Sequence, residues 1–407
     1  SIASNNCQRV SRRYLPVDGG DVMPPITPRP PRIIPDLARG TRTVGIGDSI
    51  MRGLSSATEY GRKSWFDMGC LMSNQRILRW GNLGADGETT AQILARVDDV
   101  IALRPARCVV YGGTNDVIAQ YSTATIMANL TALYRTLRGA GIEPIACTIL
   151  PIYLPAFETT YRAAIQKLNA NIAYYAQTNG MHLLDLYGAS VDPTTGDFID
   201  GYDTDGEHPH GTGAGVLGAL MAEKLAPLYP EVYPWFSSCG TDASNFITNG
   251  LFLTDSNADG IADNWSKSGA TPTASLVAES GVIVGNWQQL VWASPGQTVL
   301  QQNITRSNVG AIGDRIAFGG RVQYETSSGM WCYVTLSFYD ATPTKISSLY
   351  PLNNWSEPIT DGAFWMETEI PANTNLIQII IGNGATQTGT LRVGQLTLRN
   401  LTTLGVF

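Results

Sequence analysis

The sequence predicts an α/β region with a parallel sheet, followed by an all-β region. Across residues 41–232, short apolar runs alternate with amphipathic helical stretches, which is the pattern of a parallel sheet covered by helices on both faces. Across residues 241–407, the long helical patterns disappear. Alternating or β-branched runs recur there between clusters of Gly, Asn, Pro and Ser, which predicts a β-sandwich of the jelly-roll type.

Five apolar runs in the first region are expected to be its strands. They cover residues 43–47, 77–83, 107–111, 144–150 and 181–186. Helices are expected near residues 89–103, 122–139, 158–178 and 213–227. In the third of these, apolar side chains recur along one helix face: Tyr161, Ile165, Leu168, Ile172 and Tyr175. Sites in open parallel sheets lie at the carboxyl ends of the strands, so motifs at those positions are candidates for function.

The sandwich is predicted from five further runs with strand-like alternation. They are Leu276–Val284, Arg315–Tyr324, Cys332–Tyr339, Leu376–Gly382 and Leu391–Leu398. We expect the first region to fold around a core of its own, with the sandwich as a separate unit.

Residues 1–40 show no periodic pattern and are crowded with prolines. Seven prolines and several arginines fall in this stretch, which predicts an extended tether or strap, most simply a linker from something upstream. The chain begins Ser1-Ile2-Ala3 without a charged or apolar leader. We therefore expect a mature form or an excised fragment whose targeting signal is missing.

The overall composition excludes several classes of function. A net charge of −7 argues against a general nucleic-acid binder, because phosphate neutralisation requires a basic field. No stretch approaches the roughly 18–20 apolar residues of a membrane span. The six cysteines form no C-x-x-C pair, which disfavours a zinc site and leaves the redox compartment open.

Four short motifs follow predicted strands or precede the final helix, and together they could perform acyl transfer. The first is Gly47-Asp48-Ser49-Ile50, where a serine hydroxyl and the N–H groups of a helix start meet. The second is residues 82–89, Asn-Leu-Gly-Ala-Asp-Gly-Glu-Thr, whose glycines let the backbone approach a substrate. Each of these motifs also fits a purely structural role, the first as a helix cap and the second as a strand-to-helix turn.

The other two motifs carry an amide and an imidazole. Gly112-Gly113-Thr114-Asn115-Asp116 places an asparagine after the central strand, where its amide could donate to an oxyanion or simply form a turn. In residues 205–209, Asp-Gly-Glu-His-Pro, the carboxylate stands three residues ahead of the imidazole. That carboxylate could orient the imidazole as a base for a serine proton. Of the other two histidines, His182 lies in an apolar strand and is expected to be structural, and His210 lacks this spacing.

In this order, the four motifs resemble the blocks of the SGNH, or GDSL-type, hydrolases over residues 41–232. The resemblance implies a flavodoxin-like three-layer α/β domain and ester hydrolysis through an acyl-serine intermediate, without a required cofactor. By the same resemblance Ser49 is the nucleophile, His208 the general base and Asp205 its orienting partner. The oxyanion donors are then the N–H groups of Ser49 and Gly87 and the side chain of Asn115. Glu88 departs from the family pattern, in which Asp is usual.

The sandwich contributes two weaker candidates. Six tryptophans are candidate carbohydrate-binding residues, although core packing is the favoured interpretation for any single one; they are Trp265, Trp287, Trp292, Trp331, Trp355 and Trp365. The segment resembles jelly-roll carbohydrate-binding modules in pattern only. Oxygen ligands at Asp255, Asn257, Asp259 and Asp263 resemble a calcium loop, but the twelfth position of an EF-hand is Ser266 rather than Glu.

Together the two regions suggest an esterase that removes O-acetyl groups from a polysaccharide. It would act outside the cell, either as a secreted bacterial enzyme or on a bacteriophage virion. The alternatives are a lipase or broad carboxylesterase, disfavoured by the absence of an apolar lid segment, and a glycan-binding adhesin that uses the hydrolase fold only as a scaffold.

Overall fold

The computed structural model describes residues 41–405, except for residues 75, 154–157, 230–235, 270–271, 280–282, 295, 327–331, 356 and 385–387. The predicted tether of residues 1–40 and Trp331 lie outside the described residues. Within the described part, no helix is long and apolar enough to cross a membrane.

A five-stranded parallel sheet forms the centre of the first region, with the order β2-β1-β3-β4-β5. The strands are β1 (Arg42–Gly47), β2 (Leu78–Gly84), β3 (Arg107–Val110), β4 (Glu143–Cys147) and β5 (His182–Leu184). β1 pairs with β2 on one side and β3 on the other, so the chain reverses its winding direction at β1. Such a reversal opens a crevice at the carboxyl end of the strand. The predicted flavodoxin-like α/β fold is confirmed.

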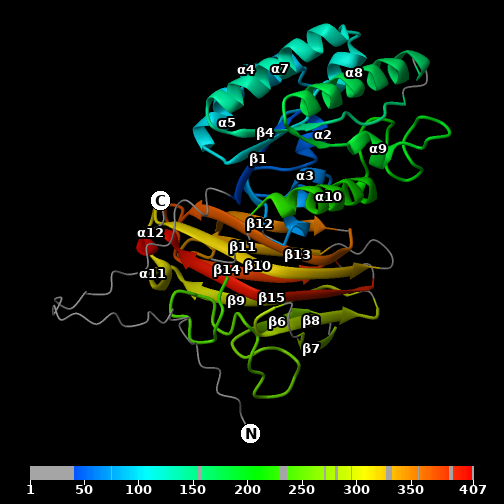
Figure 1. The fold of residues 1–407 in the computed structure, drawn as a ribbon. Coiled ribbons are helices and arrows are strands. Elements are labelled where there is room, and N and C mark those ends of the chain that lie inside the picture. Colours follow the sequence, from blue (N-terminus) through cyan, green and yellow to red (C-terminus); the bar gives the residue numbers. More distant parts are fainter. Residues whose placement is uncertain are drawn as a thin grey trace, which may run out of the picture.

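Helices cover both faces of this sheet (Figure 1). One face carries α4 (Thr90–Ala95), α5 (Val97–Leu103), α7 (Thr123–Gly139) and α8 (Glu158–Thr178). The other face, toward the sandwich, carries α3 (Trp65–Met72) and α10 (Gly211–Leu225). Shorter helices complete the region: α2 (Ser49–Arg52), α6 (Thr114–Ile118), α9 (Leu186–Ser190) and the 3-10 turn η1 (Ala226–Leu228).

Among the helices longer than five residues, the structure departs from the prediction in two places. The expected helix over 89–103 is broken at Arg96, which separates α4 from α5 and turns its side chain back onto Glu88. Helix α3 was not predicted at all. Seven of its eight residues are buried, because the helix is packed between the parallel sheet and the sandwich. It therefore lacks the alternation of apolar and polar faces by which a helix is recognised in a sequence.

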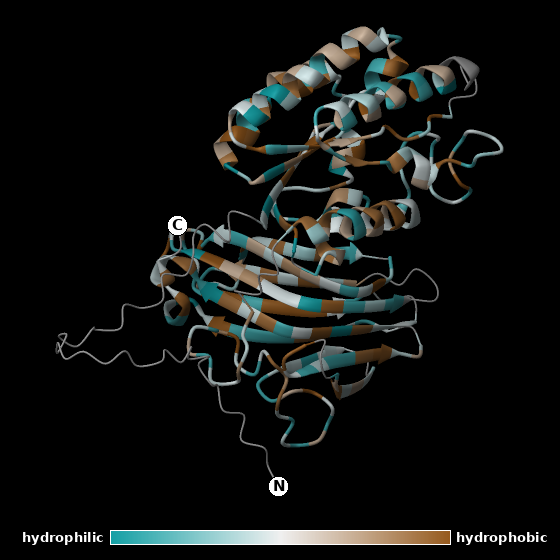
Figure 2. Cartoon of the chain, viewed as in Figure 1, coloured by the Kyte–Doolittle hydropathy of each residue, from teal (hydrophilic) through white to brown (hydrophobic). Residues whose placement is uncertain are grey.

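The second region is a sandwich of two antiparallel five-stranded sheets, ordered β13-β10-β15-β8-β7 and β12-β11-β14-β9-β6. Their strands are β6 (Ser266–Gly269), β7 (Thr273–Ala278), β8 (Asn286–Trp292), β9 (Thr298–Thr305), β10 (Arg315–Thr326), β11 (Cys332–Tyr339), β12 (Lys345–Trp355), β13 (Ile359–Glu369), β14 (Leu376–Asn383) and β15 (Gly389–Asn400). Short helices α11 (Arg306–Val309) and α12 (Leu401–Leu404) follow β9 and β15. Hydrophobic and hydrophilic residues alternate along many of these strands (Figure 2), as expected when one face is buried. The predicted all-β region is confirmed.

The strand expected over Leu276–Val284 ends early, since β7 stops at Ala278. Strands β6, β8, β9, β12 and β13 were not among the predicted runs. In β12, Pro351 and an asparagine pair interrupt the apolar alternation, and its pairing with β11 shifts register three times. Such irregularities hide a strand from a search for regular alternation.

The tryptophan candidates for carbohydrate binding are core residues, which corrects their proposed role. All five that are described are at most 7 % exposed: Trp265, Trp287, Trp292, Trp355 and Trp365. A sugar ring can stack only on an accessible aromatic face, so none of these five can serve as a platform in this conformation.

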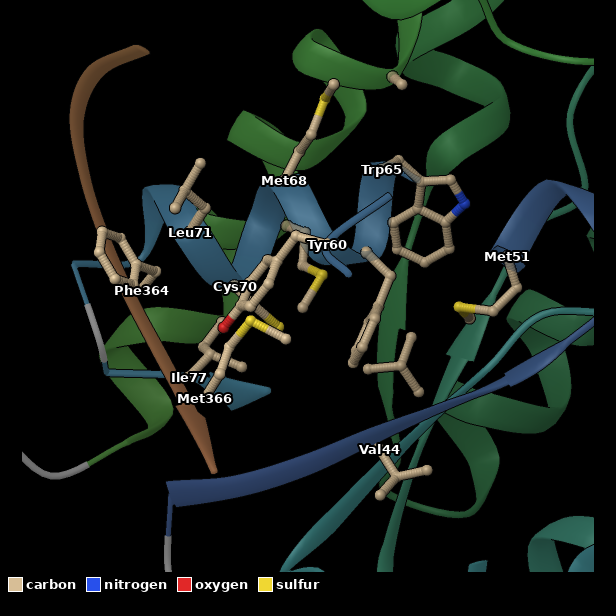
Figure 3. Close-up of a cluster of buried hydrophobic side chains, with 14 of the residues drawn as sticks. Val44, Met51, Tyr60, Trp65, Met68, Cys70, Leu71, Ile77, Phe364 and Met366 are labelled. Atoms are coloured by element: carbon tan, nitrogen blue, oxygen red, sulfur yellow. The ribbon is translucent and has the colours of Figure 1, made fainter. Parts of the chain in front are cut away.

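The buried hydrophobic cluster of the first region continues into the sandwich. The expectation that the first region folds around a core of its own stays a prediction. Figure 3 shows Leu71 and Cys70 of α3 beside Phe364 and Met366 of β13, and all four belong to the same buried cluster. The hydroxyl of the buried Tyr60 donates to the carbonyl oxygen of Trp365 at 3.3 Å. Four cysteines are free and buried in this core, two of them in β3 and β4 as predicted: Cys70, Cys108, Cys147 and Cys332.

Candidate active site

Ser49 is the first residue of α2 and directly follows the end of β1. The preceding Asp48 caps the helix, because its Oδ1 accepts the N–H of Ile50 at 3.0 Å. At Gly47 an added Cβ would lie 2.5 Å from the carbonyl oxygen of Tyr111, so only glycine allows this close approach to the chain after β3. The serine therefore sits at the strand end where the sheet reverses direction.

Ser49, His208 and Asp205 form a chain of two hydrogen bonds. Ser49 Oγ lies 2.8 Å from His208 Nε2, and Asp205 Oδ2 lies 2.9 Å from His208 Nδ1. When Nδ1–H donates to the carboxylate, Nε2 presents its lone pair to the serine hydroxyl. This arrangement can remove the serine proton as the hydroxyl attacks.

The Asp205 carboxylate is also tied to its own loop. Its Oδ1 accepts the backbone N–H groups of Glu207 at 3.1 Å and His208 at 2.8 Å. Partial burial opposes the charge, but these hydrogen bonds and the one from the His208 ring outweigh it and lower the pKa of Asp205. The group is therefore ionised at neutral pH and can stabilise a protonated imidazole.

Gly87 and Asn115 line the same pocket as Ser49. Gly87 has φ of 72°, which favours glycine, and an added Cβ there would meet no atom within 4 Å. The side-chain amide of Asn115 donates to the carbonyl oxygen of Glu88 at 3.0 Å. The structure thus brings together all the residues predicted for the triad and the oxyanion hole.

A buried carboxylate fixes the segment that carries Asn115. Asp116, 1 % exposed, accepts the backbone N–H of Thr90 at 2.7 Å and its hydroxyl at 2.6 Å. These bonds join the start of α6 to the start of α4, beside the Gly87 turn. Glu88 points elsewhere, because Arg96 Nε donates to its Oε1 at 2.8 Å. Its longer side chain therefore leaves the geometry of the turn intact.

The triad opens into a surface pocket of about 480 Å³. Much of its lining is polar: Ser49, Arg52, Lys63, Asp86, Asn115, Thr204, Asp205, Glu207 and His208. Its apolar side chains are Ile50, Leu54 and Pro209.

A sequence model of the GDSL-like lipase/acylhydrolase family matches residues 46–216, which contain every residue of this site. These residues form a GDSL-like lipase/acylhydrolase domain. No curated protein matches the chain at a significant level.

Solved structures also align with part of this chain. A GDSL-like lipase from Bacteroides thetaiotaomicron is 26 % identical, with 47 % of this chain and 90 % of that chain covered and a TM-score of 0.40. A member of the lipolytic G-D-S-L family from Veillonella parvula is 18 % identical, with coverage of 47 % and 99 % and a TM-score of 0.37. The enzymatically active domain of bacteriophage CBA120 tailspike protein 4 is 13 % identical, with coverage of 39 % and 21 % and a TM-score of 0.30.

Several pocket residues of the GDSL-like domain were missed by sequence reasoning. Arg52 forms an ion pair with Asp86 at 2.7 Å. Lys63 reaches the pocket from the loop between α2 and α3. Burial is the main cause of a raised pKa at Glu207; the charge of Asp205 adds to it, and His208 opposes it. The Asp-x-x-His spacing could have drawn attention to Glu207, whereas nothing in the sequence marks Lys63.

The remaining histidines lie outside the triad. His182 Nε2 lies 3.3 Å from Glu143 Oε1, between neighbouring strands, which fits its expected structural role. His210 is the N-cap residue of α10, and its side chain makes no capping bond.

The calcium candidates form a self-capped loop. Asp255 accepts the N–H of Gly260 at 2.9 Å, Asp259 that of Ile261 at 2.8 Å, and Asp263 that of Ser256 at 2.9 Å. Asn257 bonds Asp259 at 3.1 Å. Within the described residues, no group of three or more His, Cys, Asp or Glu side chains is placed to hold a metal. The structure thus does not bring these side chains together around one point, and calcium binding there stays a prediction.

Proposed function

We propose that the protein is a serine esterase that hydrolyses short acyl esters, with O-acetyl groups on a polysaccharide as its substrate. The observation that carries the proposal is the hydrogen-bonded chain from Ser49 through His208 to Asp205, at the mouth of an open pocket. Within an acylhydrolase domain, these are the groups that acyl transfer requires.

In the first half of the proposed reaction, Ser49 Oγ attacks the ester carbonyl while His208 Nε2 takes the serine proton. Asp205 stabilises the resulting imidazolium. The backbone N–H groups of Ser49 and Gly87 and the Asn115 amide receive the negative charge on the carbonyl oxygen. The ester C–O bond then breaks, and the alcohol leaves with the proton held by His208, so an acyl group remains on Ser49.

In the second half, water replaces the alcohol. His208 takes a proton from the water as its oxygen attacks the acyl carbonyl, and the C–O bond to Ser49 breaks. The serine recovers its proton from His208, and the carboxylic acid leaves. Every group in this sequence belongs to the chain, so the proposed mechanism requires no cofactor.

The polar pocket lining supports a short acyl group on a hydroxyl-rich alcohol, such as a sugar. The five described tryptophans are buried and cannot stack on a sugar, so the case for a polymeric substrate rests on the open pocket and on the charged and polar side chains in its lining. We extend the proposal to an extracellular setting, where polysaccharides of this kind occur.

Two assays test the proposal. Acetate release from acetylated polysaccharides should be lost in Ser49→Ala, and the chromogenic ester 4-nitrophenyl acetate should be hydrolysed much faster than 4-nitrophenyl palmitate. Faster hydrolysis of the palmitate would instead identify a lipase. No turnover of any ester by a folded protein would favour the adhesin interpretation.

A further inference from the structure

Two charged side chains of the pocket lining, Lys63 and Glu207, form no ion pair among the described residues, whereas the others do. Asp86 pairs with Arg52 at 2.7 Å, and Asp205 pairs with His208 at 2.9 Å. Among the described residues, Lys63 makes no ion pair or hydrogen bond through its ammonium group. A half-buried lysine in a site wall is thus left without a counter-charge.

The loop that carries Lys63 is fixed at its base beside the nucleophile helix. The backbone N–H of Lys63 donates to the carbonyl oxygen of Gly53, the C-cap of α2, at 3.0 Å. The adjacent Ser64 hydroxyl donates to the carbonyl oxygen of Met51 at 2.9 Å. Gly53 has φ of 47°, and a Cβ there would lie 2.2 Å from Ser64 N. The backbone of Lys63 is therefore fixed beside the nucleophile helix α2 by a tight local turn.

The sandwich fixes the outer end of the same loop. The N–H of Tyr60 donates to the carbonyl oxygen of Tyr350 at 3.1 Å, and the N–H of Tyr350 donates to that of Thr58 at 2.7 Å. The side chain of Asn353 adds a bond to Glu59 Oε1 at 3.1 Å. With both ends anchored, the loop holds the backbone of Lys63 in place before any substrate arrives, so binding does not carry the entropic cost of ordering the loop.

We propose that Lys63 binds a carboxylate of the substrate, so that the acetylated sugar is an acidic one, such as a uronic acid. This inference rests on the proposed esterase function and names its substrate class. The missing counter-charge at Lys63 is then supplied by the substrate. A single ammonium group suits a single negative charge, whereas phosphate groups are commonly held by arginine forks or several donors.

The test compares two small substrates that differ in one group: an O-acetylated methyl glucuronoside and the matching O-acetylated methyl glucoside. The measured quantity is the ratio of kcat/KM for the acidic substrate to that for the neutral one. The parent protein should favour the acidic substrate. Lys63→Met should lower the ratio by about three- to tenfold through KM, the scale of a partly exposed charged hydrogen bond, and Lys63→Arg should restore most of it.

Arg62→Ala is the matched control, because it removes the neighbouring positive charge from a residue that does not line the pocket. It should leave the ratio within about twofold of the parent value, since general surface charges act weakly. A parent protein without preference for the acidic sugar, or an equal effect of the Lys63 and Arg62 variants, would overturn the inference. Failure to hydrolyse either sugar or 4-nitrophenyl acetate would instead contradict the esterase proposal itself.

Discussion

The parallel-sheet region and the sandwich show how differently residue spacing and residue type predict function. In the first region, the predicted residues are brought together at the ends of β1, β2 and β3 and in the loop before α10. In the sandwich, tryptophans were selected for their type alone, and the five that are described are buried. Motifs that follow successive strands of one parallel sheet must lie at the same sheet edge, so their order predicts where their side chains meet. The number of tryptophans in a segment does not show which of them are buried and which are exposed.

The GDSL-like domain also depends on the sandwich for part of its structure. The catalytic side chains all belong to the GDSL-like domain, but the loop from Gly53 to Ser64 is bonded to β12 of the sandwich. Helix α3 contacts β13 and is buried between the two regions. The sandwich therefore supports one wall of the pocket and part of the core that holds β1.

Truncation is expected to have the largest effect. A chain ending at Tyr229 would expose Tyr60, Leu71 and the rest of the α3 face, which are buried against β13 in the intact protein. We expect it to aggregate or to melt at a much lower temperature, with loss of activity even on a small soluble ester. Circular dichroism and 4-nitrophenyl acetate hydrolysis measure both effects. A folded and fully active fragment would show that the two regions are independent.

The next largest effect is expected at the proposed base. His208→Ala should lower kcat by about 10³-fold or more, because the serine proton then has no acceptor. His210→Ala is the matched control, because the Asp205 side chain is hydrogen-bonded to His208 and not to His210 among the described residues. It should retain activity within about threefold. Equal losses in the two variants would contradict the assignment. Thermal unfolding of both variants separates a catalytic loss from a folding defect.

A smaller loss is expected at the oxyanion hole. Asn115→Ala should lower kcat by about 10²–10³-fold with little change in KM, because its amide matters mainly once charge develops on the carbonyl oxygen. Steady-state kinetics on a short acyl ester gives kcat and KM separately and so measures both expectations. A raised KM with unchanged kcat would make Asn115 a substrate-binding residue.

Asp48 is expected to make the stability of the folded protein depend on pH. Burial is the main cause that raises its pKa to about 8, and its Oδ2 has no hydrogen-bond partner in the described structure. The folded protein therefore keeps a proton that the unfolded chain loses above about pH 4. Stability should fall as pH rises from about 4 to 8, by up to roughly 1.4 kcal/mol per pH unit from this group.

Asp48→Asn tests this dependence, because asparagine resembles the protonated acid and can still cap α2 through its Oδ1. The gain in melting temperature over the parent should be larger at pH 8 than at pH 5. The same gain at both pH values would mean that Asp48 is not protonated in the folded state.

The fold class and the proposed catalytic residues could be predicted because each depends on local pattern. Ser49, Asn115 and His208 stand in short motifs whose strand and helix neighbours have clear periods. The interface could not be predicted in this way, because α3 is buried on both sides and has no amphipathic signal. The place of Lys63 in the pocket could not be predicted from the sequence either. It depends on the backbone bond from Lys63 to Gly53 and on the bond from Tyr60 of the same loop to Tyr350, almost 300 residues later.

The central claim is that Ser49 is the nucleophile, and covalent labelling tests it most directly. The protein is incubated with diethyl 4-nitrophenyl phosphate, and its intact mass and labelled peptide are measured by mass spectrometry. We predict one diethylphosphoryl group per chain, located on Ser49, with release of one equivalent of 4-nitrophenol and complete loss of esterase activity. Ser49→Ala should take up no label and show no turnover. A label on another residue that accompanies inactivation, or esterase activity in Ser49→Ala within about tenfold of the parent, would contradict the account.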